Sequence, residues 1–101
     1  MMKAEALWRM NPGDGDALGL INEVRARAGV SDFTELTADN LLAERGREFF
    51  VECHRRSDLI RFDKFTTDWW EKSSPGEYVE LLPIPRNQID ANPNLNQNPG
   101  Y

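Results

Sequence analysis

The chain has 101 residues, 40% of them hydrophobic, and a formal net charge of −5, so it can build one small core. The acidic balance argues against a nucleic-acid partner and an anionic membrane surface, because phosphate groups are bound by cationic surfaces. No apolar run approaches the ~20 residues that span a bilayer, so the visible chain is expected to be soluble. The lone cysteine, Cys53, excludes an internal disulfide.

Residues 1–29 are predicted to form a hairpin of two helices. Apolar residues recur at helical spacing before the Asn-Pro-Gly sequence at 11–13, which breaks helices. Asp14 or Asp16 can cap the second helix, and Gly29 suits the left-handed position that follows a helix. Such a pair is also the unit of a tetratricopeptide-like solenoid, although no second copy at a period of about 34 residues is visible.

Residues 37–64 are predicted to form a central bent helix that is rich in charge, with Thr37 as its N-cap. The apolar pattern loses its phase between Cys53 and Ser57, so a kink or tight turn is expected there, followed by a short helix to about Lys64. On the buried face, Cys53 would be an inert thiol. The residues expected on that face are Leu42, Gly46, Phe49, Phe50 and Cys53.

Three carboxylates in this helix, Glu44, Glu48 and Glu52, follow one another at steps of four residues and share a face. A retaining glycosidase needs two carboxyl groups across a cleft, one of them with a raised pKa. Here each glutamate has an arginine within one turn, such as Arg47 beside Glu44, and that neighbour would lower the pKa instead. The pattern therefore favours a structural ion-pair network, and no catalytic residue is assigned.

His54 and Asp58, four residues apart, could place two metal ligands on one helical face. A zinc site needs a third ligand, and Cys53 is expected to point elsewhere, so no metal site is predicted. Asn11–Asp16 is rich in glycine but lacks the lysine and hydroxyl of a phosphate-binding loop. No cofactor is predicted.

Trp69 and Trp70 are the only pair suited to carbohydrate stacking, because an exposed aromatic ring can cover the C–H face of a sugar. Adjacent tryptophans near a turn can equally fasten a loop to a core. Both interpretations stay open, and these two residues are the candidate ligand-binding residues of the chain.

Residues 65–101 are predicted to form an extended irregular strap. Ser73–Gly76 reads as a turn and Tyr78–Leu82 as a short extended segment. Prolines exclude regular helix or interior strand from most of residues 83–101. Spaced apolar residues would pin the strap onto a larger body; they include Leu81, Leu82, Ile84, Ile89, Leu95 and Tyr101.

Three motifs carry a resemblance to a known family. They are INEVRARAGV at Ile21–Val30, ERGREFFVECHRRSDLIRF at Glu44–Phe62, and LLPIPRNQIDANPNLNQNPGY at Leu81–Tyr101. The chain resembles the C-terminal portion of SusD/RagB family proteins, which are outer-membrane glycan-binding lipoproteins. The last motif is the most specific, since no generic structural reason makes its proline and asparagine pattern recur.

The resemblance implies an all-α, mainly helical fold built from tetratricopeptide-like helix pairs. It also implies a non-catalytic protein that captures oligosaccharides for import by a SusC-like TonB-dependent transporter. Such proteins lie on the extracellular face of the outer membrane, held by an N-terminal lipid that is absent from this chain. We therefore expect the chain to be a mainly structural C-terminal region of a longer protein.

Two other functions remain open. The chain could be a free-standing helical protein-interaction module whose Pro/Asn-rich tail is a peptide ligand. It could also be a small glycoside hydrolase, in which case a Glu48→Gln variant would lose turnover.

Overall fold

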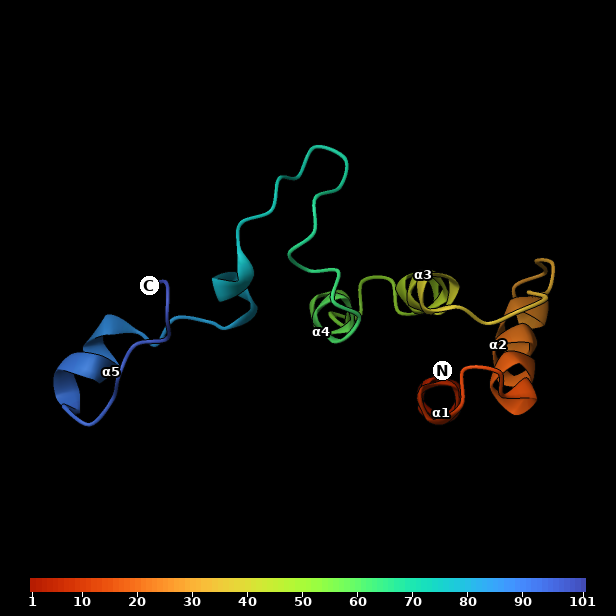
Figure 1. The fold of residues 1–101 in the computed structure, drawn as a ribbon, viewed down its shortest axis with the longest axis horizontal. Coiled ribbons are helices and arrows are strands. Elements are labelled where there is room, and N and C mark those ends of the chain that lie inside the picture. The colour runs from red at the N-terminus through yellow and green to blue at the C-terminus, as the bar shows by residue number, and fades with distance from the viewer. The chain divides into compact units, whose positions relative to one another are not determined.

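A computed structural model describes residues 1–101, and it is mainly helical, as predicted (Figure 1). Its elements are α1 (Met2–Met10), α2 (Gly15–Arg27), α3 (Ala38–Glu48), α4 (Arg55–Arg61), the 3-10 helix η1 (Glu77–Glu80) and α5 (Arg86–Ala91). The chain contains no β-sheet, only an isolated bridge between Trp69 and Lys72. It divides into two compact units, Met1–Asp58 and Leu59–Tyr101.

The first two helices form the predicted pair, and they pack against each other. In Figure 1, α1 is seen end-on whereas α2 is seen closer to side-on, so the two helices cross steeply. Ala4 on α1 and Ala17 on α2 are both completely buried. Small side chains at such positions allow two helix backbones to approach closely.

Both ends of α2 are formed by the residues that the sequence indicates. Asp14 is the N-cap, and its carboxylate accepts a hydrogen bond of 2.9 Å from the backbone N–H of Ala17. Gly29 has a φ of 71°, and the N–H of Val30 reaches back 3.1 Å to the carbonyl of Arg25. This arrangement satisfies carbonyls at the helix end that would otherwise lack partners.

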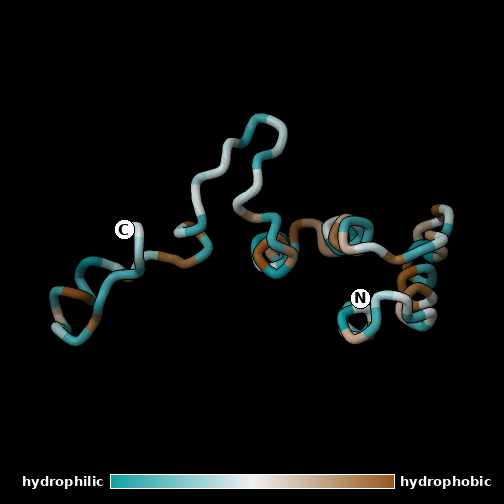
Figure 2. The backbone as a smooth tube through the Cα atoms, viewed as in Figure 1, coloured by the Kyte–Doolittle hydropathy of each residue, from teal (hydrophilic) through white to brown (hydrophobic).

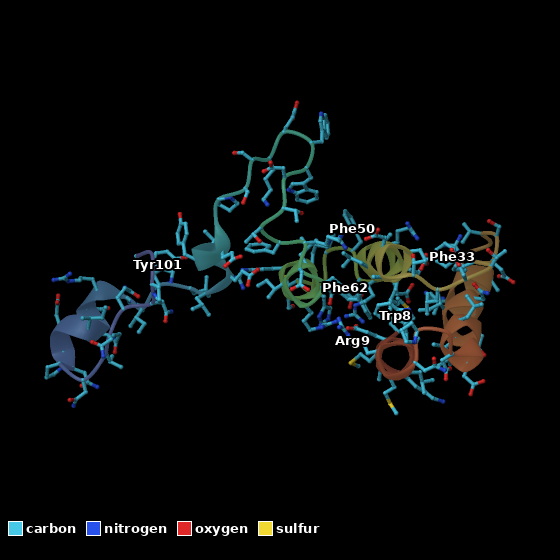
Figure 3. All side chains as sticks on the ribbon, viewed as in Figure 1. Trp8, Arg9, Phe33, Phe50, Phe62 and Tyr101 are labelled. Atoms are coloured by element: carbon cyan, nitrogen blue, oxygen red, sulfur yellow. The ribbon has the colours of Figure 1, made fainter.

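The connector between α2 and α3 is fastened to both helices of the pair. Asn22 on α2 accepts a hydrogen bond from the N–H of Phe33 at 2.9 Å and donates one to its carbonyl at 3.0 Å. Trp8 on α1 donates its indole N–H to the carbonyl of Leu36 at 2.8 Å (Figure 3). Leu36 is buried, so this hydrogen bond fastens α1 to a buried residue of the connector.

Helix α3 begins as predicted but ends earlier. Thr37 forms a capping box with Asn40, in which each side chain bonds the backbone N–H of the other residue. The helix then stops at Glu48, so the break begins earlier than the interval predicted for it, Cys53–Ser57, and overlaps that interval only at Cys53 and His54. Val51 and Cys53 have φ values of 66° and 61° in the turn after α3.

The predicted buried face of this segment is only partly correct. Leu42 is buried, but Phe50 is 80% exposed and Cys53 is exposed, so Cys53 is not the buried thiol that we expected. The helix instead turns Leu41 and Arg45 inward, one turn apart on a neighbouring face. An arginine at a buried position hides this face from a hydrophobicity pattern.

The second unit contains two short helices where none was predicted. Glu77–Glu80 forms η1, so the predicted extended segment at Tyr78–Leu82 is wrong over its first half. Arg86–Ala91 forms α5 within the segment expected to be mostly irregular. Pro85 precedes α5 and has a φ of −55°, which is close to the helical value. A proline ring is disfavoured inside a helix but is compatible with the start of one, and Pro85 lies at the start of α5.

The C-terminal segment folds back on itself. The side-chain amide of Gln97 accepts from the N–H of Ile84 at 2.8 Å and donates to its carbonyl at 2.9 Å, as a neighbouring strand would. Asn98 donates to the carbonyl of Leu82 at 2.6 Å, and the hydroxyl of Tyr101 donates to the carbonyl of Leu81 at 2.9 Å. We call residues 78–101, closed by these bonds, the C-terminal clasp. Its packing onto a larger body stays a prediction.

Candidate functional site

The two candidate tryptophans lie on a tight hairpin in the loop between α4 and η1. The N–H of Trp69 donates to the carbonyl of Lys72 at 3.0 Å, and the N–H of Lys72 donates to that of Trp69 at 2.7 Å. Trp70 and Glu71 therefore form a two-residue tip, with Glu71 at a φ of 57°. We call Trp69–Lys72 the tryptophan hairpin. Trp70 is 88% exposed and Trp69 is 55% exposed.

The base of the tryptophan hairpin is held by hydrogen bonds within the same loop. The ammonium group of Lys72 donates to the carbonyl of Phe65 at 2.7 Å and lies 5.7 Å from the centres of the Phe65 and Trp69 rings. The carboxylate of Asp68 accepts a hydrogen bond from the N–H of Ser74. These contacts fix the loop although it contains no helix or sheet.

A buried ion network lies in the first unit. The guanidinium of Arg45 lies 2.8 Å from a carboxylate oxygen of Asp58 and 3.2 Å from one of Glu5. Glu5 also accepts a hydrogen bond of 2.9 Å from Arg9 (Figure 3). The side chains of Arg45 and Asp58 are 4% and 1% exposed. Because a buried charge left alone is very costly, these pairs hold α1, α3 and α4 in one arrangement.

Glu44 joins α2 to α3. Its carboxylate accepts from Arg25 at 2.6 Å and from Arg47 at 2.5 Å, and its side chain is 5% exposed. Burial by itself raises the pKa of Glu44, but the hydrogen bonds and charges of Arg47 and Arg25 outweigh it and leave the pKa below its ordinary value. A carboxyl group that ionises so readily is a poor general acid at neutral pH.

The remaining glutamates of the predicted row do not complete a catalytic pair. Glu48 lies 2.6 Å from Arg27 of α2, and Glu52 lies in the turn after α3 rather than on its face. The predicted arginine partner within one turn is confirmed for Glu44, which pairs with Arg47, whereas Glu48 pairs with an arginine of another helix. The sequence does not reveal the two arginine partners that come from α2.

His54 and Asp58 also have contacts other than those of a metal pair. The imidazole ring of His54 lies 5.0 Å from the ring of Phe49, and Asp58 is bound by Arg45. No group of three or more His, Cys, Asp or Glu side chains is placed to hold a metal ion.

An open groove of about 650 Å³ lies beside the end of α3, and no sequence pattern indicated it. Phe49, Phe50, Val51 and Cys53 lie along it, with Arg55 at its floor. Figure 2 shows this connection between α3 and α4 as a hydrophobic stretch, and Figure 3 labels Phe50 beside it. None of the helices is long and apolar enough to cross a membrane.

Comparison with known proteins decides the family. The model of the SusD family matches residues 1–81. The chain belongs to the SusD family. The family resemblance carried by the three motifs is thereby confirmed.

Starch-binding protein SusD of Bacteroides thetaiotaomicron is 40% identical over 111 aligned residues, which cover 100% of this chain and 20% of that protein. The chain thus spans about a fifth of the length of this SusD family relative.

Proposed function

We propose that this chain is a non-catalytic, mainly structural region of a cell-surface protein that captures oligosaccharides. In this proposal the whole protein lies on the extracellular face of the outer membrane, held by an N-terminal lipid, and passes its glycan to a SusC-like TonB-dependent transporter. The observation that carries the proposal is the 40% identity, along the whole chain, to a starch-binding protein.

The buried charges support the structural part of the proposal. Acid catalysis on a glycan needs a carboxyl group that stays protonated near neutral pH. Glu44 is held ionised between two arginines, and Glu48 is paired with Arg27. Glu44 and Glu48 also line an open pocket of about 430 Å³, but in it they are paired with arginines and brace the helices of the first unit.

The proposal is tested by adding a soluble starch fragment, maltoheptaose, to a whole SusD family protein that carries this region. We expect saturable binding and recovery of the intact oligosaccharide. Shorter products, formed by the wild type and lost in a Glu48→Gln variant, would replace this function with glycoside hydrolysis.

A second candidate function, a helical interaction module with a peptide tail, is favoured by one observation. Leu81 and Leu82, which begin the proline-containing stretch of the tail, are 52% and 69% exposed. Limited proteolysis distinguishes the two: a peptide ligand would be cut rapidly between Leu81 and Pro85, whereas the C-terminal clasp should protect this stretch by its bonds to Gln97 and Asn98.

A further inference from the structure

The tryptophan hairpin presents one indole ring outward on a fixed support. Trp70 is 88% exposed at the tip, whereas most large aromatic side chains bury much of their surface. The bridge between Trp69 and Lys72 limits the tip to two residues, so the backbone under Trp70 has little freedom. In Figure 1 the loop that carries the hairpin leaves the end of α4 and returns toward the 3-10 helix as a single excursion.

The support below the tip is built from polar contacts that do not involve Trp70. Lys72 is bonded to the carbonyls of Phe65 and Thr67 at 2.7 and 3.3 Å, and the hydroxyl of Thr67 is bonded to the carbonyl of Lys64 at 2.9 Å. A ligand that covers Trp70 would therefore not have to order the loop first. Such preorganisation lowers the entropic cost of binding.

Polar residues lie next to Trp70 along the chain. Glu71 follows Trp70 directly and is exposed, and Asp68 precedes the hairpin, where its carboxylate accepts a hydrogen bond from the N–H of Ser74. An aromatic face with hydrogen-bond acceptors beside it matches a pyranose ring, which has one face of C–H groups and a rim of hydroxyl groups.

We infer that the tryptophan hairpin is a carbohydrate-binding element in which Trp70 stacks against one sugar ring of an oligosaccharide. The inference rests on the proposed function and adds a contact site for the glycan within this chain. Trp69 has a supporting role, because it closes the hairpin through its backbone and its ring lies near the ammonium group of Lys72.

The size of the exposed surface favours a sugar over a protein as the occupant. A stable protein interface buries about 800 Å² on each partner and centres on a cluster of apolar anchors. The hairpin offers one largely free indole, flanked by the charged residues Asp68, Glu71 and Lys72. One indole face has about the area of one sugar ring, so this surface fits a single stacking contact.

The test is a titration of the 101-residue chain with maltoheptaose, followed through the indole N–H signals of its three tryptophans in NMR spectra. The signal of Trp70 is expected to shift saturably and that of Trp69 to shift less. Trp8 is the internal reference, because its indole N–H is bonded to Leu36 in the other unit. A Trp70→Ala variant should bind roughly tenfold more weakly or worse, as expected on loss of a central aromatic contact.

The matched control is Phe50→Ala, which removes another exposed aromatic ring, at 80% exposure, from the first unit. It should bind maltoheptaose as the wild type does. An unchanged Trp8 signal in the Trp70→Ala variant would show that the first unit remains folded. A Trp70 signal that does not move with sugar, or equal affinities of Trp70→Ala and wild type, would overturn the inference.

Two further outcomes separate this inference from the proposed function. If a whole family protein carrying this region binds maltoheptaose equally well with and without Trp70→Ala, the inference fails and the proposed function stands. If the whole protein does not bind any glycan, the proposed function fails. Broadening of the Trp70 signal with protein concentration alone would assign the hairpin to a protein contact and overturn the carbohydrate assignment.

Discussion

At the scale of single residues, the pKa of Glu44 determines which chemistry is available to the charged helix α3. Two arginines hold its pKa below the ordinary value although burial acts in the opposite direction. Its folded-state pKa is therefore lower than its unfolded-state pKa. The resulting stabilisation is fully present above the unfolded-state pKa and is lost as the pH falls through the folded-state pKa.

Replacing Glu44 by Gln removes this charge and should lower the free energy of unfolding at pH 7 by roughly 1–3 kcal/mol, because Arg25 loses its buried anionic partner. Urea unfolding at pH 7 and at pH 3 measures the effect. The difference between variant and wild type should be smaller at pH 3 than at pH 7, because protonation of the wild-type carboxylate as the pH falls weakens its pairing with Arg25.

The control for this variant is Glu48→Gln. Glu48 is paired with Arg27, whose side chain is 68% exposed, so its loss should cost only about 0.2–1 kcal/mol. Equal losses in the two variants would contradict the special role of Glu44.

Gly46 and Arg55 give a second prediction at this scale. The guanidinium of Arg55 crosses α3 at Gly46 and donates to the carbonyl of Leu42 at 2.9 Å. A Cβ at position 46 would lie 2.8 Å from that guanidinium. In an Arg55→Ala background, Gly46→Ala should therefore stabilise the chain by roughly 0.5–1 kcal/mol through helix propensity.

In the presence of Arg55 the same substitution should gain less, because the guanidinium has to move away from Leu42. Thermal unfolding of the two single variants and the double variant forms the complete cycle. If the two substitutions change the free energy of unfolding additively within about 0.3 kcal/mol, the contact between Arg55 and residue 46 does not contribute to stability.

Among the elements of secondary structure, the helix ends were the most predictable parts. Gly29 and Thr37 act at short range through their own backbone and side-chain chemistry, so the sequence was sufficient to place them, and it limited the N-cap of α2 to Asp14 or Asp16, of which Asp14 is the cap. The end of α3 was placed too late. Phe49 and Phe50 continue the apolar spacing of the helix. That spacing does not show which face of the helix packs against the core.

The burial of Arg45 could not be predicted for a related reason. Its partners Glu5 and Asp58 are 40 and 13 positions away in the sequence, and only the folded chain brings the three together. The sequence named Trp69 and Trp70 as candidate ligand-binding residues, and that role stays a prediction. Their exposure depends on how the loop folds, including its backbone bridge to Lys72, which the sequence did not indicate.

The C-terminal clasp gives a prediction at the scale of an element. Gly100 has a φ of 93°, and a Cβ there would lie 2.5 Å from the Cβ of Tyr78. Because a Cβ atom is fixed to the backbone, Tyr78 cannot yield without a shift of its segment. Gly100→Ala should therefore open the contact between Tyr78 and Tyr101, whose rings now lie 5.2 Å apart.

Amide hydrogen exchange measures this opening. The N–H of Ile84, now bonded to Gln97, should exchange faster in Gly100→Ala. Gly29→Ala is the matched control, since Gly29 also has a positive φ but its Cβ would meet no atom within 4 Å. Protection of Ile84 that is unchanged in Gly100→Ala would contradict the clasp.

For the whole molecule, the chain is a SusD family region whose first unit is organised by buried ion pairs and whose second unit carries the exposed hairpin and the clasp. The individual helices of the first unit followed from periodicity, whereas the all-α class and the family followed from the resemblance that the motifs carry. The glycan role could not be derived from periodicity, because the same amphipathic helices serve many functions.

The central claim, binding of a glycan without turnover, is tested most directly by one calorimetric titration of maltoheptaose into a whole protein that carries this region. Binding without turnover predicts injection heats that decline to saturation and a baseline that returns to its starting level after every injection. A baseline that stays displaced while substrate remains, and recovers only as it is consumed, would show hydrolysis and contradict the claim.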